Sequence, residues 1–356
     1  MKYFSPTLPL FILLLNACTL TKPANQLPVG KGEKHLKNLQ QLTFGGDNAE
    51  AYWSFNGKML TFQSNNAAWG LQCDQIFTAS IKQLQDSGFK PSLISTGDGR
   101  TTCSYFMPDN KHILFASTHL GAKSCPAAPE VKGAYVWPIY DTYDIFVSDL
   151  SGKITKQLTN APGYDAEATI SPDGKKIIFT STRSGDLELW IMDIDGNNQK
   201  QLTFGLGYDG GAFFSPDSKK IVFRSSRPSL PEEVAKYKDL LSRNLVEPTQ
   251  MEIYTMNIDG TNLKQITHLG KANWAPFYHH DNKRIIFSSN HKSTKGYDFQ
   301  LYMINEDGTG LEQITTESIF NSFPMFSPNG KKLVFSSNRN NGGTRATNLF
   351  IADWVD

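Results

Sequence analysis

Net charge is almost absent from this 356-residue chain, in which 35 lysine and arginine residues oppose 34 aspartate and glutamate residues. A strongly basic surface of the kind that binds nucleic acid is therefore not expected. Common catalytic signatures are missing as well, including Gly-x-Ser-x-Gly, His-Glu-x-x-His and paired Cys-x-x-Cys. These absences argue against a nucleic-acid-binding protein and against the hydrolase and zinc-enzyme classes that carry those motifs.

Long apolar runs are equally scarce, and the clearest lies at the N-terminus. Residues 8–15 are too few to cross a bilayer, and Lys2 precedes them, as in a secretory signal. The run ends in Leu15-Asn16-Ala17-Cys18, which resembles a bacterial lipobox with a lipidated cysteine. We therefore predict a signal peptide over 1–17 and a lipid anchor on Cys18. The alternative is an ordinary signal peptide with an incidental cysteine.

The residues that follow Cys18 indicate where the protein resides. Residues 18–38 contain Pro, Gly and Lys and are expected to form a flexible tether. Thr19 stands where an aspartate would resemble an inner-membrane retention signal. The sequence thus predicts an exported protein that is anchored in the outer membrane, faces the periplasm and touches the membrane through its lipid only.

Cysteine is rare, and only three cysteines follow Cys18. Export permits oxidation, and Cys73, Cys103 and Cys125 all map to one side of the expected fold. One disulfide and one free thiol are predicted. The pair Cys73–Cys125 is favoured because both lie in adaptable loops, although pairing with Cys103 stays open.

A four-strand unit is repeated along the rest of the chain. The clearest copy contains the turn Ser171–Gly174, the apolar run Ile177–Phe179, the strand Leu189–Met192 and the segment Lys200–Thr203. The Ile-Ile-Phe run does not alternate with polar residues, so it suits a strand buried on both faces. The corresponding strand of each copy ends in a phenylalanine: Phe62, Phe115, Phe179, Phe223, Phe287 and Phe335.

The position of the fourth strands indicates how the repeats close. Gln-Leu-Thr or a variant ends each copy, but one such segment precedes the first copy and none follows the last strand, Leu349–Trp354. We therefore predict an all-β ring of six four-stranded blades over residues 39–356. Residues 39–44 would complete the last blade, which removes the exposed edges of an open array.

Four segments of the clearest copy resemble the WD40-like PD40 repeats of the TolB propeller family. They are Ser171-Pro-Asp-Gly-Lys-Lys, Ser181-Thr-Arg, Met192-Asp-Ile-Asp-Gly and Lys200-Gln-Leu-Thr. The resemblance covers about residues 39–356 and implies the six-bladed β-propeller of periplasmic proteins. Neither the N-terminal α/β domain of TolB nor the hydrolase domain of prolyl oligopeptidases, which carry related rings, is expected in this chain.

One face of the predicted ring gathers the irregular features. Two insertions emerge there, residues 120–141 and 229–250, and the second is expected to place a short helix near 231–245 across the mouth. These residues of the same face are candidate ligand contacts: Asp165, Glu167, Asp209, Arg183, Arg227, His291, Arg339 and Trp137. A purely structural role is the alternative, because such polar groups also satisfy nearby backbone amides and cap strand ends.

The expected function is a non-catalytic binding scaffold for an envelope protein, peptide or glycan, acting as a monomer. Loops on a rigid frame commonly carry binding sites. The alternative is a hydrolase or lyase for an oligosaccharide or small ester that uses mouth carboxylates such as Glu50 and Glu167 as acid and base. No metal site or cofactor is predicted, although a channel-bound cation such as calcium is compatible with the pattern.

Two further motifs have simpler explanations. Residues 205–210 match a dinucleotide fingerprint by letter, but they lead into a strand where a phosphate site needs a helix. The pair His279-His280 contains metal-binding residue types, but neighbouring strand residues point to opposite faces.

Overall fold

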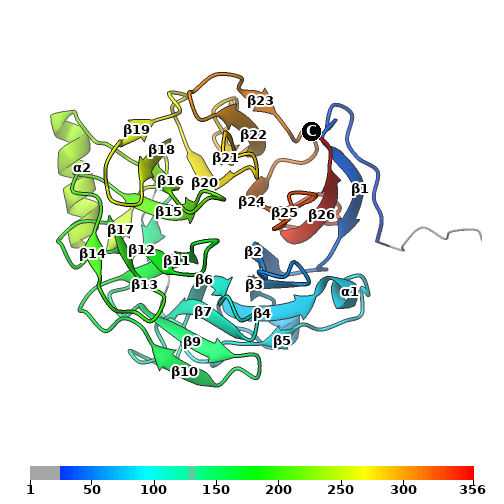
Figure 1. Cartoon of the computed structure of the whole chain (residues 1–356), viewed down its shortest axis with the longest axis horizontal. Coiled ribbons are helices and arrows are strands. Elements are labelled where there is room, and N and C mark those ends of the chain that lie inside the picture. Colours follow the sequence, from blue (N-terminus) through cyan, green and yellow to red (C-terminus); the bar gives the residue numbers. More distant parts are fainter. Residues whose placement is uncertain (1–24, 128, 130, 132) are drawn as a thin grey trace, which may run out of the picture.

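Six β-sheets surround a central axis in a computed structural model of the chain (Figure 1). The structure describes residues 25–127, 129, 131 and 133–356. Each of the six sheets has four antiparallel strands, and the sheets follow one another round the ring in chain order. The predicted all-β, six-bladed propeller is therefore confirmed.

Within each blade the first strand lies nearest the axis and the fourth lies outermost (Figure 1). Blades one and two contain β2 Asp47–Trp53, β3 Met59–Asn65, β4 Gln75–Ser80, β5 Ser92–Leu93, β6 Thr101–Phe106, β7 His112–Ser117, β9 Asp144–Asp149 and β10 Ile154–Gln157. Blades three and four contain β11 Asp165–Ile170, β12 Lys176–Ser181, β13 Glu188–Asp193, β14 Lys200–Gln201, β15 Asp209–Phe214, β16 Lys220–Ser225, β18 Glu252–Asn257 and β19 Lys264–Gln265. Blades five and six contain β20 Asn273–Tyr278, β21 Arg284–Ser289, β22 Gln300–Asn305, β23 Glu312–Gln313, β24 Asn321–Phe326, β25 Lys332–Ser337, β26 Asn348–Trp354 and β1 Leu36–Gln41.

The second strand of each blade is buried between neighbouring sheets. Ile177, Ile178 and Phe179 of β12 are all inaccessible to solvent, as the unbroken apolar run predicts. Full burial of one such side chain contributes about 1.5–3 kcal/mol. The six equivalent phenylalanines are likewise fully buried: Phe62, Phe115, Phe179, Phe223, Phe287 and Phe335.

The recurring Gln-Leu-Thr segment fastens the short fourth strand to the third. In blade three the Thr203 hydroxyl accepts a hydrogen bond from the Leu189 amide at 2.8 Å. The Gln201 side chain donates to the Thr203 carbonyl at 2.7 Å. The threonine bond recurs in four other blades, through Thr43, Thr159, Thr267 and Thr315.

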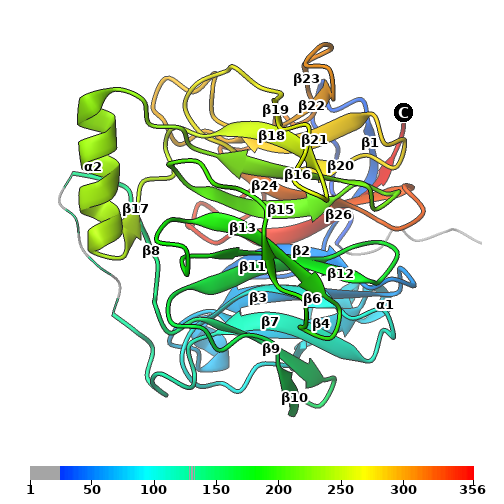
Figure 2. The ribbon, with the colours of Figure 1, turned by 60° about the vertical axis from the view of Figure 1, so that its left-hand side comes forward.

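The two insertions meet beside the ring. In the first, β8 (Trp137–Pro138) pairs with β17 (Leu245–Val246), which follows α2 (Pro231–Ser242) in the second. The short inserted helix is confirmed, but it stands at the perimeter of the ring rather than across the mouth (Figures 1 and 2). Its buried Tyr237 and Leu240 hold it there by packing. The chain after the helix reaches back to the first insertion through β17 and through the Asn244 carbonyl, which accepts a hydrogen bond from the Ile139 amide at 2.7 Å. In the described part of the chain, the other helices are the single turns η1 (Ala67–Trp69) and α1 (Ile81–Leu84).

The N-terminal strand lies against the last strand of the chain. β1 pairs with β26 from Leu36 opposite Trp354 to Gln41 opposite Phe350, so it completes blade six three residues earlier than the predicted segment 39–44. The earlier start brings the side chain of Leu36 into the core of that blade, where Leu39 is also buried.

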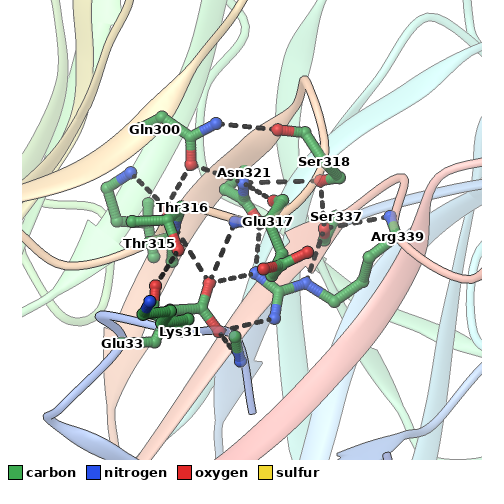
Figure 3. A network of polar contacts seen from close by, with 12 residues as sticks. Lys31, Glu33, Gln300, Thr315, Thr316, Glu317, Ser318, Asn321, Ser337 and Arg339 are labelled. Carbon is green, nitrogen blue, oxygen red and sulfur yellow. Dashed lines mark hydrogen bonds and ion pairs between the residues drawn. The ribbon is translucent and has the colours of Figure 1, made fainter. Parts of the chain in front are cut away.

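The segment before β1 is also packed on blade six, which corrects the expectation of a flexible tether over residues 18–38 for residues 25–38. Glu33 is buried and forms a two-pronged ion pair with Arg339, with nitrogen–oxygen distances of 3.0 and 3.2 Å (Figure 3). The same carboxylate accepts a bond from the Thr316 amide at 3.0 Å. Burial opposes ionisation of Glu33, but the charge of Arg339 and these hydrogen bonds hold its pKa below the ordinary value. Composition suggested mobility here because it does not reveal a buried partner 306 positions away.

Within residues 25–356, apart from the three undescribed positions, no helix is long and apolar enough to cross a membrane.

Candidate functional site

Each innermost strand carries a β-bulge at the same position. The bulged residue has a positive φ in every blade, between +45° and +59°. Such a backbone is uncommon outside glycine and redirects the side chain from the regular alternation. All six bulged residues line one cavity at the centre of the ring: Glu50, Cys103, Glu167, Gly211, Ala275 and Phe323.

The bulges of blades three and four form one charged network. Glu167 forms a buried ion pair with Arg224 of β16 and accepts hydrogen bonds from the Tyr208 hydroxyl at 2.6 Å, the Thr180 hydroxyl at 2.8 Å and the Gly211 amide at 2.9 Å. Burial alone would raise the pKa of Glu167. The charge of Arg224 and the hydrogen bonds from Tyr208 and Thr180 outweigh burial and lower that pKa below its usual value.

The bulges of blades one and two are Glu50 and Cys103, and their environment differs sharply. Glu50 has no ion-pair partner among the described residues, and its buried Oε2 atom has no hydrogen-bond partner there. Burial raises the pKa of Glu50 to about 7, helped by the nearby charge of Glu167 and opposed by the Cys103 thiol and Arg224. Burial and the two glutamates also raise the pKa of the Cys103 thiol, which is therefore not an activated nucleophile.

The first insertion covers the cavity with aromatic rings. The Arg224 guanidinium lies 5.3 Å from the ring centre of Trp137 and 4.9 Å from that of Tyr208. Trp137 also packs against Trp274, with ring centres 5.1 Å apart, and the Trp274 indole donates to the Pro248 carbonyl of the second insertion at 2.9 Å. The two insertions therefore build one wall of the site together.

The cavity has a volume of about 410 Å³ and an aromatic lining. Its charged lining consists of three carboxylates and two guanidinium groups. Asp74 pairs with Arg100 at 2.6 Å, and Glu167 pairs with Arg224, so Glu50 is left without an opposite charge. An aromatic cavity with a few convergent polar groups is the usual form of a ligand site.

Of the predicted ligand contacts, Glu167 and Trp137 line this cavity. Asp165 and Arg183 instead form an ion pair within blade three at 2.5 Å, and the Arg183 guanidinium lies 4.9 Å from the ring centre of Trp190. Blade four repeats the arrangement with Asp209 and Arg227. These pairs favour the structural alternative, because the charges are already neutralised locally.

Two further predicted contacts are also engaged within their own blades. Arg339 donates to Asn321 at 2.9 Å besides binding Glu33. The His291 imidazole packs on Tyr302 with ring centres 4.5 Å apart. Neither residue is part of the cavity lining in the described part of the chain.

The candidate ligand contacts predicted from the sequence did not include Arg224, Tyr208 and Cys103, although the sequence contains one signal for Arg224. The residue after the strand-two phenylalanine is Arg224 in blade four, whereas the other copies have uncharged residues there: Gln63, Ala116, Thr180, Ser288 and Ser336. A lone charge inside a buried strand calls for a buried partner, which Glu167 provides.

Cys73 and Cys125 are joined by a disulfide, with Cα atoms 5.9 Å apart, and Cys103 has a free thiol. The bond links the loop before β4 to the first insertion. It thus ties the insertion that covers the cavity to blade one. Cys18, the predicted lipidation site, lies outside the described residues.

His279, His280 and Asp356 approach one another at the opposite end of the ring. The Arg284 guanidinium lies 3.1 Å from His279 Nδ1 and 2.7 Å from the Asp356 carboxylate. The positive charge of Arg284 therefore already contacts two of these three groups.

The model of the TolB β-propeller domain, PD40, matches residues 132–238 and 239–352, more than half of the chain. The chain belongs to the TolB β-propeller family. Among solved structures, this TolB-like propeller resembles TolB from Acinetobacter baumannii with 20% identity and a TM-score of 0.56, covering 85% of this chain and 65% of that protein. The protein assigned as TolB in Agrobacterium tumefaciens gives 18% identity and a TM-score of 0.55, covering 87% and 91%. No curated protein sequence matches significantly. At these identities the structures establish the fold of the TolB-like propeller, while its function has to be argued from the cavity.

Proposed function

We propose that this chain is an exported binding propeller that takes a side group of an envelope protein, peptide or glycan into its central cavity. The observation that carries the proposal is the convergence of six bulged residues and the Trp137 cap on one aromatic cavity. Non-glycine residues with a left-handed backbone tend to cluster where function requires them, and five of the six bulges are of this kind.

The surrounding frame suits binding. Six sheets with buried second strands form a rigid ring, and the disulfide and the β8–β17 pair fix the insertions against it. A preorganised site loses little conformational entropy on binding. The partner is proposed to meet a single propeller, in the periplasm, without nucleic acid.

Cross-linking in intact cells followed by purification tests this function. Trp137→Ala is expected to lose the captured partner, because it removes the cap from the cavity. Leu263→Ala is the control, since it changes an exposed apolar side chain in the loop between β18 and β19. Thermal unfolding of both variants checks that each is still folded, so that a loss of capture reflects the cavity. Undiminished capture by Trp137→Ala would rule out the cavity as the binding site.

The anchor is part of the same proposal. We infer that residues 1–17 are a signal peptide and that Cys18 carries lipid in the outer membrane, on the basis of the Leu-Asn-Ala-Cys motif. Cys18→Ala should move the protein from the membrane fraction to the soluble fraction, whereas Cys103→Ser should not. Membrane association of Cys18→Ala would contradict the anchor.

One observation favours a second candidate, a hydrolase or lyase acting on an oligosaccharide or small ester. Glu50 and Glu167 line the same cavity with pKa values displaced in opposite directions, a pattern that acid–base pairs share. Turnover of such a substrate that disappears in Glu50→Gln would establish this candidate. A substrate panel without turnover would leave the binding function.

A further inference from the structure

The cavity already contains one site for a cation. The guanidinium of Arg224 is held by the carboxylate of Glu167 and lies over the rings of Trp137 and Tyr208. A carboxylate with two aromatic faces is a favourable environment for a cation, because the ring faces carry partial negative charge. The protein thus supplies both the host groups and the cation on the side of blades three and four.

Beside blades one and two, the Arg100 guanidinium is already paired with Asp74, and among the described residues the carboxylate of Glu50 has no cation of its own. Glu50 occupies the bulge position equivalent to Glu167, and the same cavity is also lined by Tyr52, Tyr143 and Tyr164. In blade one the residue corresponding to Arg224 is the neutral Gln63. Because the other two carboxylates are paired with Arg100 and Arg224, the cavity carries one uncompensated carboxylate when Glu50 is ionised.

We propose that the cavity binds one aliphatic ammonium group, as found on a lysine side chain or a small alkylamine, with Glu50 as its counter-ion. This inference rests on the proposed binding function and names the chemistry of the group that enters the cavity.

The other classes of ligand fit less well. A calcium ion requires six to eight oxygen ligands, and only one unpaired carboxylate is offered here. An anion would meet the charge of Glu50. A neutral apolar group would leave the buried Oε2 atom of Glu50 without a partner, which is costly. An ammonium group satisfies that oxygen with a charged hydrogen bond, and its methylene stem can pack against the tyrosine rings.

Calorimetric titration of the purified protein at pH 8 tests the proposal. The probes are n-butylammonium, Nα-acetyl-lysine methylamide and the same lysine derivative acetylated on its side chain. The first two probes distinguish binding of a small alkylamine from binding of a lysine side chain in a peptide. The third probe lacks the positive charge but keeps the methylene chain of lysine. Glu50→Gln is the test variant, and Glu232→Gln on the exposed surface of α2 is the matched control.

We expect at least one ammonium probe to bind about tenfold or more tightly than the acetylated probe. This preference should vanish in Glu50→Gln and persist in Glu232→Gln. Equal affinity for the charged and acetylated probes, a preference that survives in Glu50→Gln, or no binding of either ammonium probe would overturn the ammonium site. Partner capture by the native protein but not by Trp137→Ala would still uphold the binding function in each of these cases.

Discussion

The guanidinium of Arg224 fills the space that a side chain at Gly211 would occupy. A Cβ atom added to Gly211 would overlap with Arg224 Nη1. Gly211 is the bulged residue of blade four. In the other blades the bulged residue has a side chain, whereas in blade four this space is filled by Arg224 from the second strand of the same blade. Arg224 can therefore reach Glu167 because Gly211 has no side chain.

Gly211→Ala should consequently break the Glu167–Arg224 pair. Displacing Arg224 would leave a buried carboxylate unpaired, and loss of a buried partner costs about 3–5 kcal/mol. Urea unfolding would measure the change. Gly342→Ala is the control for backbone strain, because Gly342 has a similar φ of +64° and an added Cβ there would meet no neighbour within 4 Å. Equal losses in the two variants would show that strain, not displacement of Arg224, is responsible.

The stability of the protein should fall as pH rises from about 5 to 8, in part because of Glu50. Its pKa is about 7 in the folded chain and near the ordinary 4.5 when unfolded, so the folded state binds more protons within this range. Burial and the Glu167 charge cause the shift. Glu50→Gln should therefore be more stable than the native protein at pH 8, by up to about 3 kcal/mol, and similar to it at pH 5.

Chemical unfolding at pH 5 and pH 8 measures this difference. Other groups also titrate in this range, and comparing the variant with the native protein removes their contribution. An identical pH dependence in both proteins would mean that Glu50 ionises normally. Glu232→Gln should reproduce the native curve.

The buried Glu33–Arg339 ion pair should contribute far more to the stability of the fold than the exposed Lys34–Glu312 ion pair. Glu33→Gln leaves the Arg339 charge buried with weaker partners and should destabilise the fold by about 3–5 kcal/mol. Lys34→Ala removes an exposed ion pair with Glu312 and should cost about 1 kcal/mol or less. Thermal unfolding distinguishes the two, and equal effects would indicate that residues 25–35 contribute little to blade six.

Peptide mapping without reduction should recover Cys73 linked to Cys125 and leave Cys103 available for alkylation. Three free thiols would contradict the pairing. The Cys73→Ser and Cys125→Ser double variant should lose about 2–4 kcal/mol, because the bond closes a loop with a sequence separation of 52. Cys103→Ser serves as the control.

The ring itself could be predicted from the sequence because the residues that form each blade lie within one repeat. The buried run Ile177–Phe179 and the Gln-Leu-Thr segment act within one blade, so pattern alone locates them. The ion pairs within single blades, such as Asp165 with Arg183, are also local in sequence. A structural role for these residues was therefore one of the two interpretations of the sequence.

The cavity could not be predicted to the same extent because its contacts join different blades. Glu167 and Arg224 lie 57 positions apart, and the bulges that turn Glu50 and Cys103 inward leave no distinct residue type in the sequence. Burial of Glu33 likewise depends on a partner near the other end of the chain. In each case a long-range contact overrides the local pattern.

The packing of residues 25–35 on blade six also sets the reach of the proposed anchor. Gln26 pairs with Gln40 at the outer edge of the ring, so a lipid on Cys18 would be connected to that edge by residues 19–24. Fully extended, residues 19–24 span about 20–25 Å. The edge of blade six would then stay close to the bilayer, so a partner would meet the cavity near the membrane surface.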